Sequence, residues 1–138
     1  MAKRTWVRDP DAGGVKITDP VKKRTKERIE RYAEKHFKGK YSRIDVRFRG
    51  QFCYVDAFTE PNPRPLLLPG ESKREKIERM RNTPTHLCRL RYYGNEEAWS
   101  MGFFRYSNEK YELCAFQSGE FYGPPEDAFE IAAGVYLE

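Results

Sequence analysis

The fold of this chain is decided by the segment RIDVRFRGQFCYVDAFTEP, residues 43–61. Apolar and polar residues alternate on both sides of Gly50-Gln51, and a period of two is typical of β-strands. Glycine at the first position of a two-residue loop favours a type II′ turn, so the segment predicts a β-hairpin over residues 43–58. The turn also predicts the register, because pairing proceeds outward from it one residue at a time.

This register gives the hairpin two different faces. The first face is apolar, with the predicted pairs Phe48–Cys53, Val46–Val55 and Ile44–Ala57. The second face combines charges with aromatic rings, and its predicted pairs are Arg49–Phe52, Arg47–Tyr54, Asp45–Asp56 and Arg43–Phe58. Antiparallel sheets commonly bury one face only. We therefore expect the apolar face to join the core, and the second face requires a separate explanation.

A long amphipathic helix is expected before the hairpin, over residues 20–38. Asp19-Pro20 supplies a side-chain acceptor and a proline at the first helical position, and Gly39 supplies a favourable end. The predicted buried stripe has the three- and four-residue spacing of a helix face and consists of Ile29, Tyr32, Ala33, His36 and Phe37. Most of the lysines and arginines of the helix lie off this stripe.

The chain after the hairpin predicts further strands and two shorter helices. Residues 60–83 combine a proline-broken linker with a strongly charged helix over about 71–82. Residues 85–122 indicate an antiparallel meander, with tight turns at Asn108-Glu109 and Ser118-Gly119. A last helix is expected over residues 125–134.

Together these elements predict one α+β domain over residues 19–138. A mobile N-terminal tail over residues 1–18 precedes it, with at most a short strand over residues 15–17. The antiparallel sheet is expected to have five to six strands, from hairpin 43–58 and meander 85–122, with the first helix packed on one face. The length of 138 residues fits one domain. Aromatic residues make up 14% of the chain, a density that requires burial or a partner and therefore indicates a folded protein.

Positive charge is concentrated in the first part of the chain. The net charge is +5, but residues 1–50 hold 16 Lys and Arg against 7 Asp and Glu, whereas residues 51–138 hold 10 against 14. A basic front half favours an anionic partner such as nucleic acid. The alternative is a basic surface that binds no particular anion.

The cysteines and the N-terminus indicate a cytoplasmic protein. Cys53, Cys88 and Cys114 are widely spaced and odd in number, which favours reduced thiols over a disulfide framework. The N-terminus lacks the apolar stretch of a signal peptide, and no apolar run approaches the roughly 20 residues needed to span a bilayer. No cofactor or catalytic motif is present, so no cofactor is expected and the question of catalysis stays open.

The polar hairpin face and the basic helix together suggest a nucleic-acid-binding surface. Arginine neutralises phosphate, and rings on a sheet surface stack unpaired bases, which favours a single-stranded ligand. The candidate residues are Lys22, Lys23, Lys26, Arg31, Lys35, Arg43, Arg47, Arg49, Phe52 and Tyr54. The opposing interpretation is that the last helix and the linker cover this face, and that the arginines pair with Asp45, Asp56 and Glu60.

A metal-dependent hydrolase or nuclease is a second hypothesis. Asp45 and Asp56 are predicted to face each other, and like charges in that position require compensation. A divalent metal would compensate, and so would the flanking Arg43 and Arg47. No third ligand lies at a recognisable spacing, so no metal ligands are assigned. His86 and Cys88, predicted on the same side of one strand, match no zinc motif.

A protein-interaction or oligomerisation module is the third hypothesis. Leu66, Leu67 and Leu68 are held between prolines in PRPLLLP and form a candidate partner-binding segment. Strands 98–106 and 110–117 are apolar on both faces, which indicates either a covered sheet or an exposed aromatic patch. The oligomeric state is not predicted.

Overall fold

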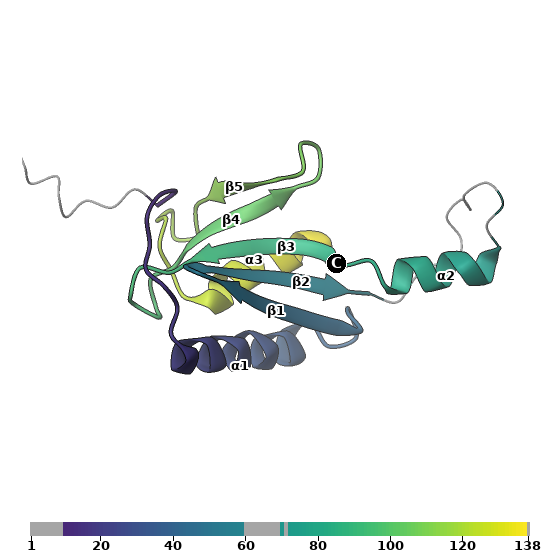
Figure 1. Cartoon of the computed structure of the whole chain (residues 1–138), viewed down its shortest axis with the longest axis horizontal. Coiled ribbons are helices and arrows are strands. Elements are labelled where there is room, and N and C mark those ends of the chain that lie inside the picture. Colours follow the sequence, from purple (N-terminus) through teal and green to yellow (C-terminus); the bar gives the residue numbers. More distant parts are fainter. Residues whose placement is uncertain (1–9, 60–69, 71, 138) are drawn as a thin grey trace, which may run out of the picture.

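The computed structural model describes residues 10–59, 70 and 72–137 (Figure 1). The elements are α1 (Asp19–His36), β1 (Arg43–Arg49), β2 (Phe52–Phe58), α2 (Lys73–Arg81), β3 (Thr85–Arg91), β4 (Ser100–Arg105), β5 (Lys110–Cys114) and α3 (Pro125–Tyr136). The strands form one antiparallel sheet in the order β1-β2-β3-β4-β5. The predicted α+β domain with an antiparallel sheet is confirmed, with five strands in the described residues.

Helices α1 and α3 form a layer on one face of the sheet. In Figure 1, α3 lies behind the sheet and α1 runs along the β1 side. α1 packs against β1 and α3, and α3 packs against β3. The core lies between this layer and the sheet and includes the fully buried Ile29, Phe129, Val55 and Leu90. One face of the sheet is therefore covered, and no helix of the described residues covers the other.

The hairpin register is confirmed at every predicted pair, from Arg49 opposite Phe52 to Arg43 opposite Phe58. Gly50 has a φ of +61°, the left-handed value that a type II′ turn requires at its first position. Ile44, Val46 and Cys53 are buried on the core face. The turn chemistry and the period of two thus determine both the pairing and the two faces.

The register in the second half of the sheet differs from prediction at two points. Between β2 and β3, Val55 pairs with Cys88 but Asp56 pairs with His86, so one extra residue forms a β-bulge. His86 therefore faces Asp56 and not, as predicted, the side of Cys88. Between β4 and β5, Arg105 pairs with Lys110, whereas the two-residue turn predicted at Asn108-Glu109 would pair it with Glu112.

The loop between β4 and β5 explains the second difference. It spans residues 106–109, twice the predicted length, and Glu109 closes it with a φ of +52°. The predicted strand around residues 120–122 is not formed. In its place Trp99 and Gly123 make an isolated bridge, with N···O distances of 2.8 and 2.9 Å.

The chain before α1 packs against one end of the sheet. Val15 donates to the carbonyl of Tyr92, Ile17 donates to that of Gly50, and the Ile17 side chain is fully buried. This differs from a mobile tail that ends at residue 18. Residues 1–9 of the predicted tail lie outside the described residues.

Helix α2 stands beyond the end of the sheet where β2 finishes and β3 begins (Figure 1). A capping box begins it: the Glu75 backbone N–H donates to the Ser72 hydroxyl, and the Ser72 N–H donates to the Glu75 carboxylate. No helix in the described part of the chain is long and apolar enough to cross a membrane.

Candidate nucleic-acid interface

The uncovered face of the sheet, here called the open face, carries five arginines. Arg43, Arg47 and Arg49 come from β1, and Arg89 and Arg91 come from β3. They share a face because Arg47 and Arg89 both pair with Tyr54, and Arg49 and Arg91 both pair with Phe52. The predicted residues Arg43, Arg47, Arg49, Phe52 and Tyr54 are thus brought together. Arg89 and Arg91 were missed, although their alternation with Cys88 and Leu90 signals them.

Most of these guanidinium groups lie over aromatic rings. Arg43 lies 4.0 Å from the ring centroid of Phe58, and Arg89 lies 4.4 Å from that of Phe52. Arg91 also lies over Phe52, at 4.7 Å. Such cation–π contacts hold the planar group against the sheet while its edges keep N–H donors for a ligand. Among the described residues, Arg49 has no carboxylate partner.

Asp56 lies in the middle of this face and has a 3% exposed side chain. Its Oδ2 accepts from Nη2 of Arg47 at 2.8 Å, and its Oδ1 lies 2.9 Å from Nδ1 of His86. Asp45 faces Asp56 as predicted and contacts Arg47 at 3.4 Å. The compensation that the facing carboxylates require thus comes from Arg47 and His86, whereas Arg43, the other expected partner, lies over Phe58.

A hollow of about 530 Å³, here called the central hollow, opens beside Asp56. Its lining consists of side chains from all five strands and includes Arg47, Arg49, Tyr54, His86, Phe104 and Tyr111. Gly102 lies on this face next to Tyr111, and a Cβ there would come within 3.1 Å of the Tyr111 Cβ. Burial and the nearby Asp56 charge raise the pKa of Tyr111, so its hydroxyl stays protonated and available as a donor.

Residues 10–13 cross the open face at the Arg91 end (Figure 1). Arg91 donates to the carbonyl of Gly13 at 2.8 Å and to that of Asp11 at 3.2 Å. Tyr93 donates its hydroxyl to the carbonyl of Ala12 at 2.9 Å. Pro10 and Asp11 also border a small crevice with Arg89. These contacts leave the part of the face around Arg43, Arg47 and Arg49 open.

The basic residues predicted on α1 do not join this surface. α1 belongs to the helix layer, so the sheet separates its exposed side from the open face. Lys22 pairs with Asp19 at 3.7 Å, and Lys26 pairs with Glu30 at 3.8 Å. The remaining members of the predicted set are exposed on the helix: Lys23, Arg31 and Lys35. The single basic surface expected from the sequence is therefore two separate surfaces.

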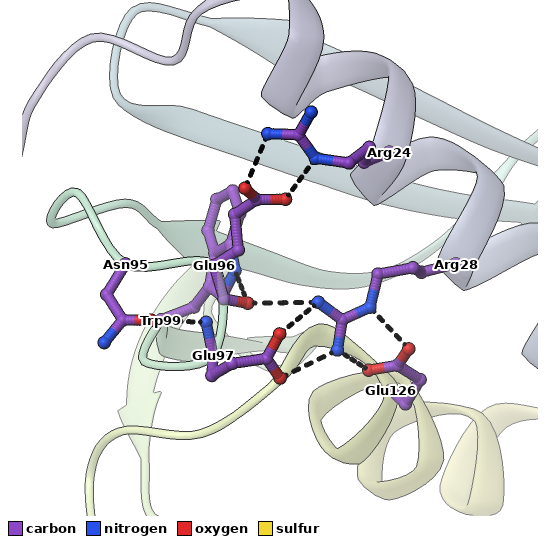
Figure 2. Close-up of polar contacts among 7 residues, drawn as sticks. All are labelled: Arg24, Arg28, Asn95, Glu96, Glu97, Trp99 and Glu126. Carbon is purple, nitrogen blue, oxygen red and sulfur yellow. Dashed lines mark hydrogen bonds and ion pairs between the residues drawn. The ribbon is translucent and has the colours of Figure 1, made fainter.

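On the helix side, arginines join distant elements (Figure 2). Arg28 makes bidentate contacts with Glu97 and Glu126, with shortest distances of 2.7 Å to each. Arg24 makes a bidentate contact with Glu96 at 2.7 and 3.0 Å. These contacts fasten α1 to the β3–β4 loop and to the start of α3. This cluster supports the fold and offers no unpaired group for a ligand.

Cys53 and Cys88 are buried on the core face, and Cys114 is partly buried against the core. Burial raises the pKa of Cys88 to about 12 and raises that of Cys53 well above its usual value, so both remain neutral. His86 faces the opposite side of the sheet from Cys88 because of the bulge. Within the described residues, no group of three or more His, Cys, Asp or Glu is placed to hold a metal ion. Leu66, Leu67 and Leu68 lie outside the described residues.

Comparison with known proteins does not assign the chain to a family. No protein-family model, no curated protein and no solved structure matches the chain.

Proposed function

We propose that this protein is a small binding module for single-stranded nucleic acid and that the open face is its binding surface. The observation that carries the proposal is the grouping of five arginines with aromatic rings on a sheet face that no described helix covers. Arginine contacts with phosphate supply affinity regardless of sequence. Rings and guanidinium planes on a sheet stack unpaired bases.

The exposed part of this face suits single-stranded nucleic acid better than a duplex. Phe52, Tyr54 and Phe58 are half-buried, so they present ring edges and partial faces between the arginines. A base contributes about 1–3 kcal/mol when it stacks on an aromatic side chain, and only unpaired bases have free faces for this contact. Guanidinium groups already stacked on rings add flat surfaces of the same kind.

The test compares two double variants that remove the same charge from opposite sides of the sheet. Arg43→Ala/Arg49→Ala alters the open face, and Arg31→Ala/Lys35→Ala alters the exposed side of α1. Binding of a fluorescent single-stranded oligonucleotide is measured by anisotropy from 50 to 300 mM salt. We expect the first variant to lose roughly tenfold in affinity and about 1.4 in the slope of log affinity against log salt.

The Arg31→Ala/Lys35→Ala variant is expected to bind nearly as the native protein does. Equal losses in the two variants would mean that affinity follows net charge and not the open face. Unchanged anisotropy of the oligonucleotide at 50 mM salt with tens of micromolar native protein would reject the proposal altogether.

A further inference from the structure

His86 is held in one orientation at the central hollow. Its Nδ1 lies 2.9 Å from Asp56, and its backbone N–H donates to the Tyr106 hydroxyl at 2.7 Å. The imidazole ring packs against Phe104, with the ring centroids 4.8 Å apart. These contacts position the ring before a ligand arrives, which lowers the entropic cost of a hydrogen bond to it.

Asp56 determines which nitrogen of His86 carries the proton. A carboxylate only accepts hydrogen bonds, and Asp56 is already paired with the guanidinium of Arg47, so Nδ1 of His86 must be the donor. In the neutral ring Nε2 is then an acceptor, and no described residue donates to it. Because Nδ1 points to buried Asp56 and the His86 side chain is 35% exposed, the Nε2 edge faces the hollow.

We propose that the central hollow is a nucleobase subsite, in which an N–H of one unpaired base donates to Nε2 of His86. This inference rests on the proposed function and adds a place for one particular nucleotide of the strand. Tyr54 and Tyr111 supply ring surface, with centroids 5.8 Å apart and planes inclined by 62°. The volume of about 530 Å³ lies within the range of small-molecule pockets, and every nucleobase has an N–H on its Watson–Crick edge.

The distribution of charge places the base inside the hollow and the phosphate at its rim. At the His86 side of the hollow the polar groups, Asp56 and the Nε2 of His86, are acceptors, and a phosphate oxygen, itself an acceptor, cannot pair with them. Arg47 and Arg49 line the hollow from β1, and Arg49 is exposed and suited to bind the adjoining phosphate. A nucleotide fits this distribution, because the N–H of its flat base can donate to Nε2 of His86 while its phosphate binds Arg49.

Histidine side-chain nitrogen signals test this subsite in the native protein. The chain has two histidines, and His36 on α1 is exposed on the helix side, where it serves as an internal control. Full-length ¹⁵N-labelled protein at pH 8 is titrated with a ten-nucleotide single-stranded DNA and, separately, with an abasic strand of the same number of phosphates. We expect the Nε2 signal of His86 to move with the DNA alone and the signals of His36 to move with neither.

The outcomes separate this inference from the proposed function. DNA that binds but leaves His86 unchanged overturns the subsite and keeps the open face as the binding surface. Absence of binding by both strands removes both proposals. A shift of His86 by the abasic strand, or by an acidic peptide of matched charge, as large as that by the DNA also overturns the subsite.

A variant pair supplies an independent measurement of the same base contact. His86→Phe keeps a ring against Phe104 and removes the acceptor, whereas Arg43→Ala changes a residue that does not line the hollow. We expect the native protein to favour the DNA over the abasic strand by about tenfold or more. His86→Phe should reduce this preference at least threefold. Arg43→Ala should weaken the binding of both strands and leave the ratio of the two affinities unchanged. An unchanged ratio in folded His86→Phe, verified by its thermal unfolding, contradicts the subsite.

Discussion

The arginines on the two sides of the sheet make different contacts. On the helix side, Arg24 and Arg28 make bidentate contacts with glutamates far away in the sequence, and these contacts hold α1 in place (Figure 2). On the open face, Arg43 and Arg89 lie over rings with their N–H edges available. The number of positive charges on a surface therefore does not locate a binding surface. What matters is whether each guanidinium is already paired with carboxylates within the fold, as Arg47 is with Asp45 and Asp56 even on the open face.

The largest expected effect concerns the covered face. Ile17 lies before α1 and is fully buried, whereas Val15, two residues earlier, is 48% exposed. We expect Ile17→Ala to lower the free energy of unfolding by about 2–5 kcal/mol through lost burial and a cavity. Val15→Ala should change it by less than about 0.5 kcal/mol. Urea unfolding followed by circular dichroism measures both, and a small effect of Ile17→Ala would show that the segment before α1 is dispensable to the core.

The second prediction concerns the arginine that joins three elements. Arg28→Ala removes the charged hydrogen bonds to Glu97 and Glu126. The two carboxylates then lose this partner and lie close together near the start of α3. We expect a loss of about 1–3 kcal/mol in the free energy of unfolding. The matched control is Arg24→Ala, because the Arg24 side chain is 54% exposed and solvent screens its ion pair, so we expect a clearly smaller loss. Equal losses in the two variants would contradict the special position of Arg28.

The third prediction tests the open face in the same assay. Arg49 is exposed and has no carboxylate partner among the described residues, so we expect Arg49→Ala to change the free energy of unfolding by less than about 0.5 kcal/mol. Oligonucleotide affinity should fall in this variant and remain unchanged in Arg28→Ala under conditions where that variant is folded. The reverse pattern, with Arg49 important for stability, would remove the distinction between the two sides.

The sequence predicts the hairpin in detail because local chemistry determines it. A glycine that accepts a positive φ fixes the turn, and the turn fixes which side chains share a face. The facing pair Asp45 and Asp56 was therefore foreseen, together with the need to compensate it. The helix was predicted over 20–38 and spans Asp19–His36, so its bounds were only approximately accessible. Thr18 and not Asp19 is at the N-cap, without a side-chain capping hydrogen bond, and the helix ends before Gly39.

The rest of the site depends on non-local arrangements. The bulge that turns His86 toward Asp56 adds one residue between β2 and β3, and the sequence around Leu87 carries no turn signal for it. The side of the sheet on which α1 packs is decided by its fit with α3 and β1, so the separation of Lys23 and Arg31 from the arginine face could not be predicted. Arg89 and Arg91 could have been assigned to that face, because they alternate with buried Cys88 and Leu90.

The smallest expected effect is a pH dependence on the helix side. The side-chain hydrogen bond from Arg24 lowers the pKa of Glu96. Burial opposes this effect, and the charges of Arg24 and Arg28 add to the lowering. A carboxyl group whose pKa is lower in the folded state stabilises the fold above its unfolded pKa, and that contribution disappears as the pH falls through the folded pKa. Glu96→Gln should therefore be less stable than the native protein by about 0.5 kcal/mol at pH 7, and this deficit should shrink as the pH falls below the usual pKa of a glutamate. Urea unfolding at pH 7, 5, 4 and 3 measures the difference. In an Arg24→Ala background the same substitution should show a smaller pH dependence, because only the charge of Arg28 then lowers the pKa of Glu96. A deficit that persists unchanged to pH 3 in the native background would mean that the Glu96 contact acts through packing and not through charge.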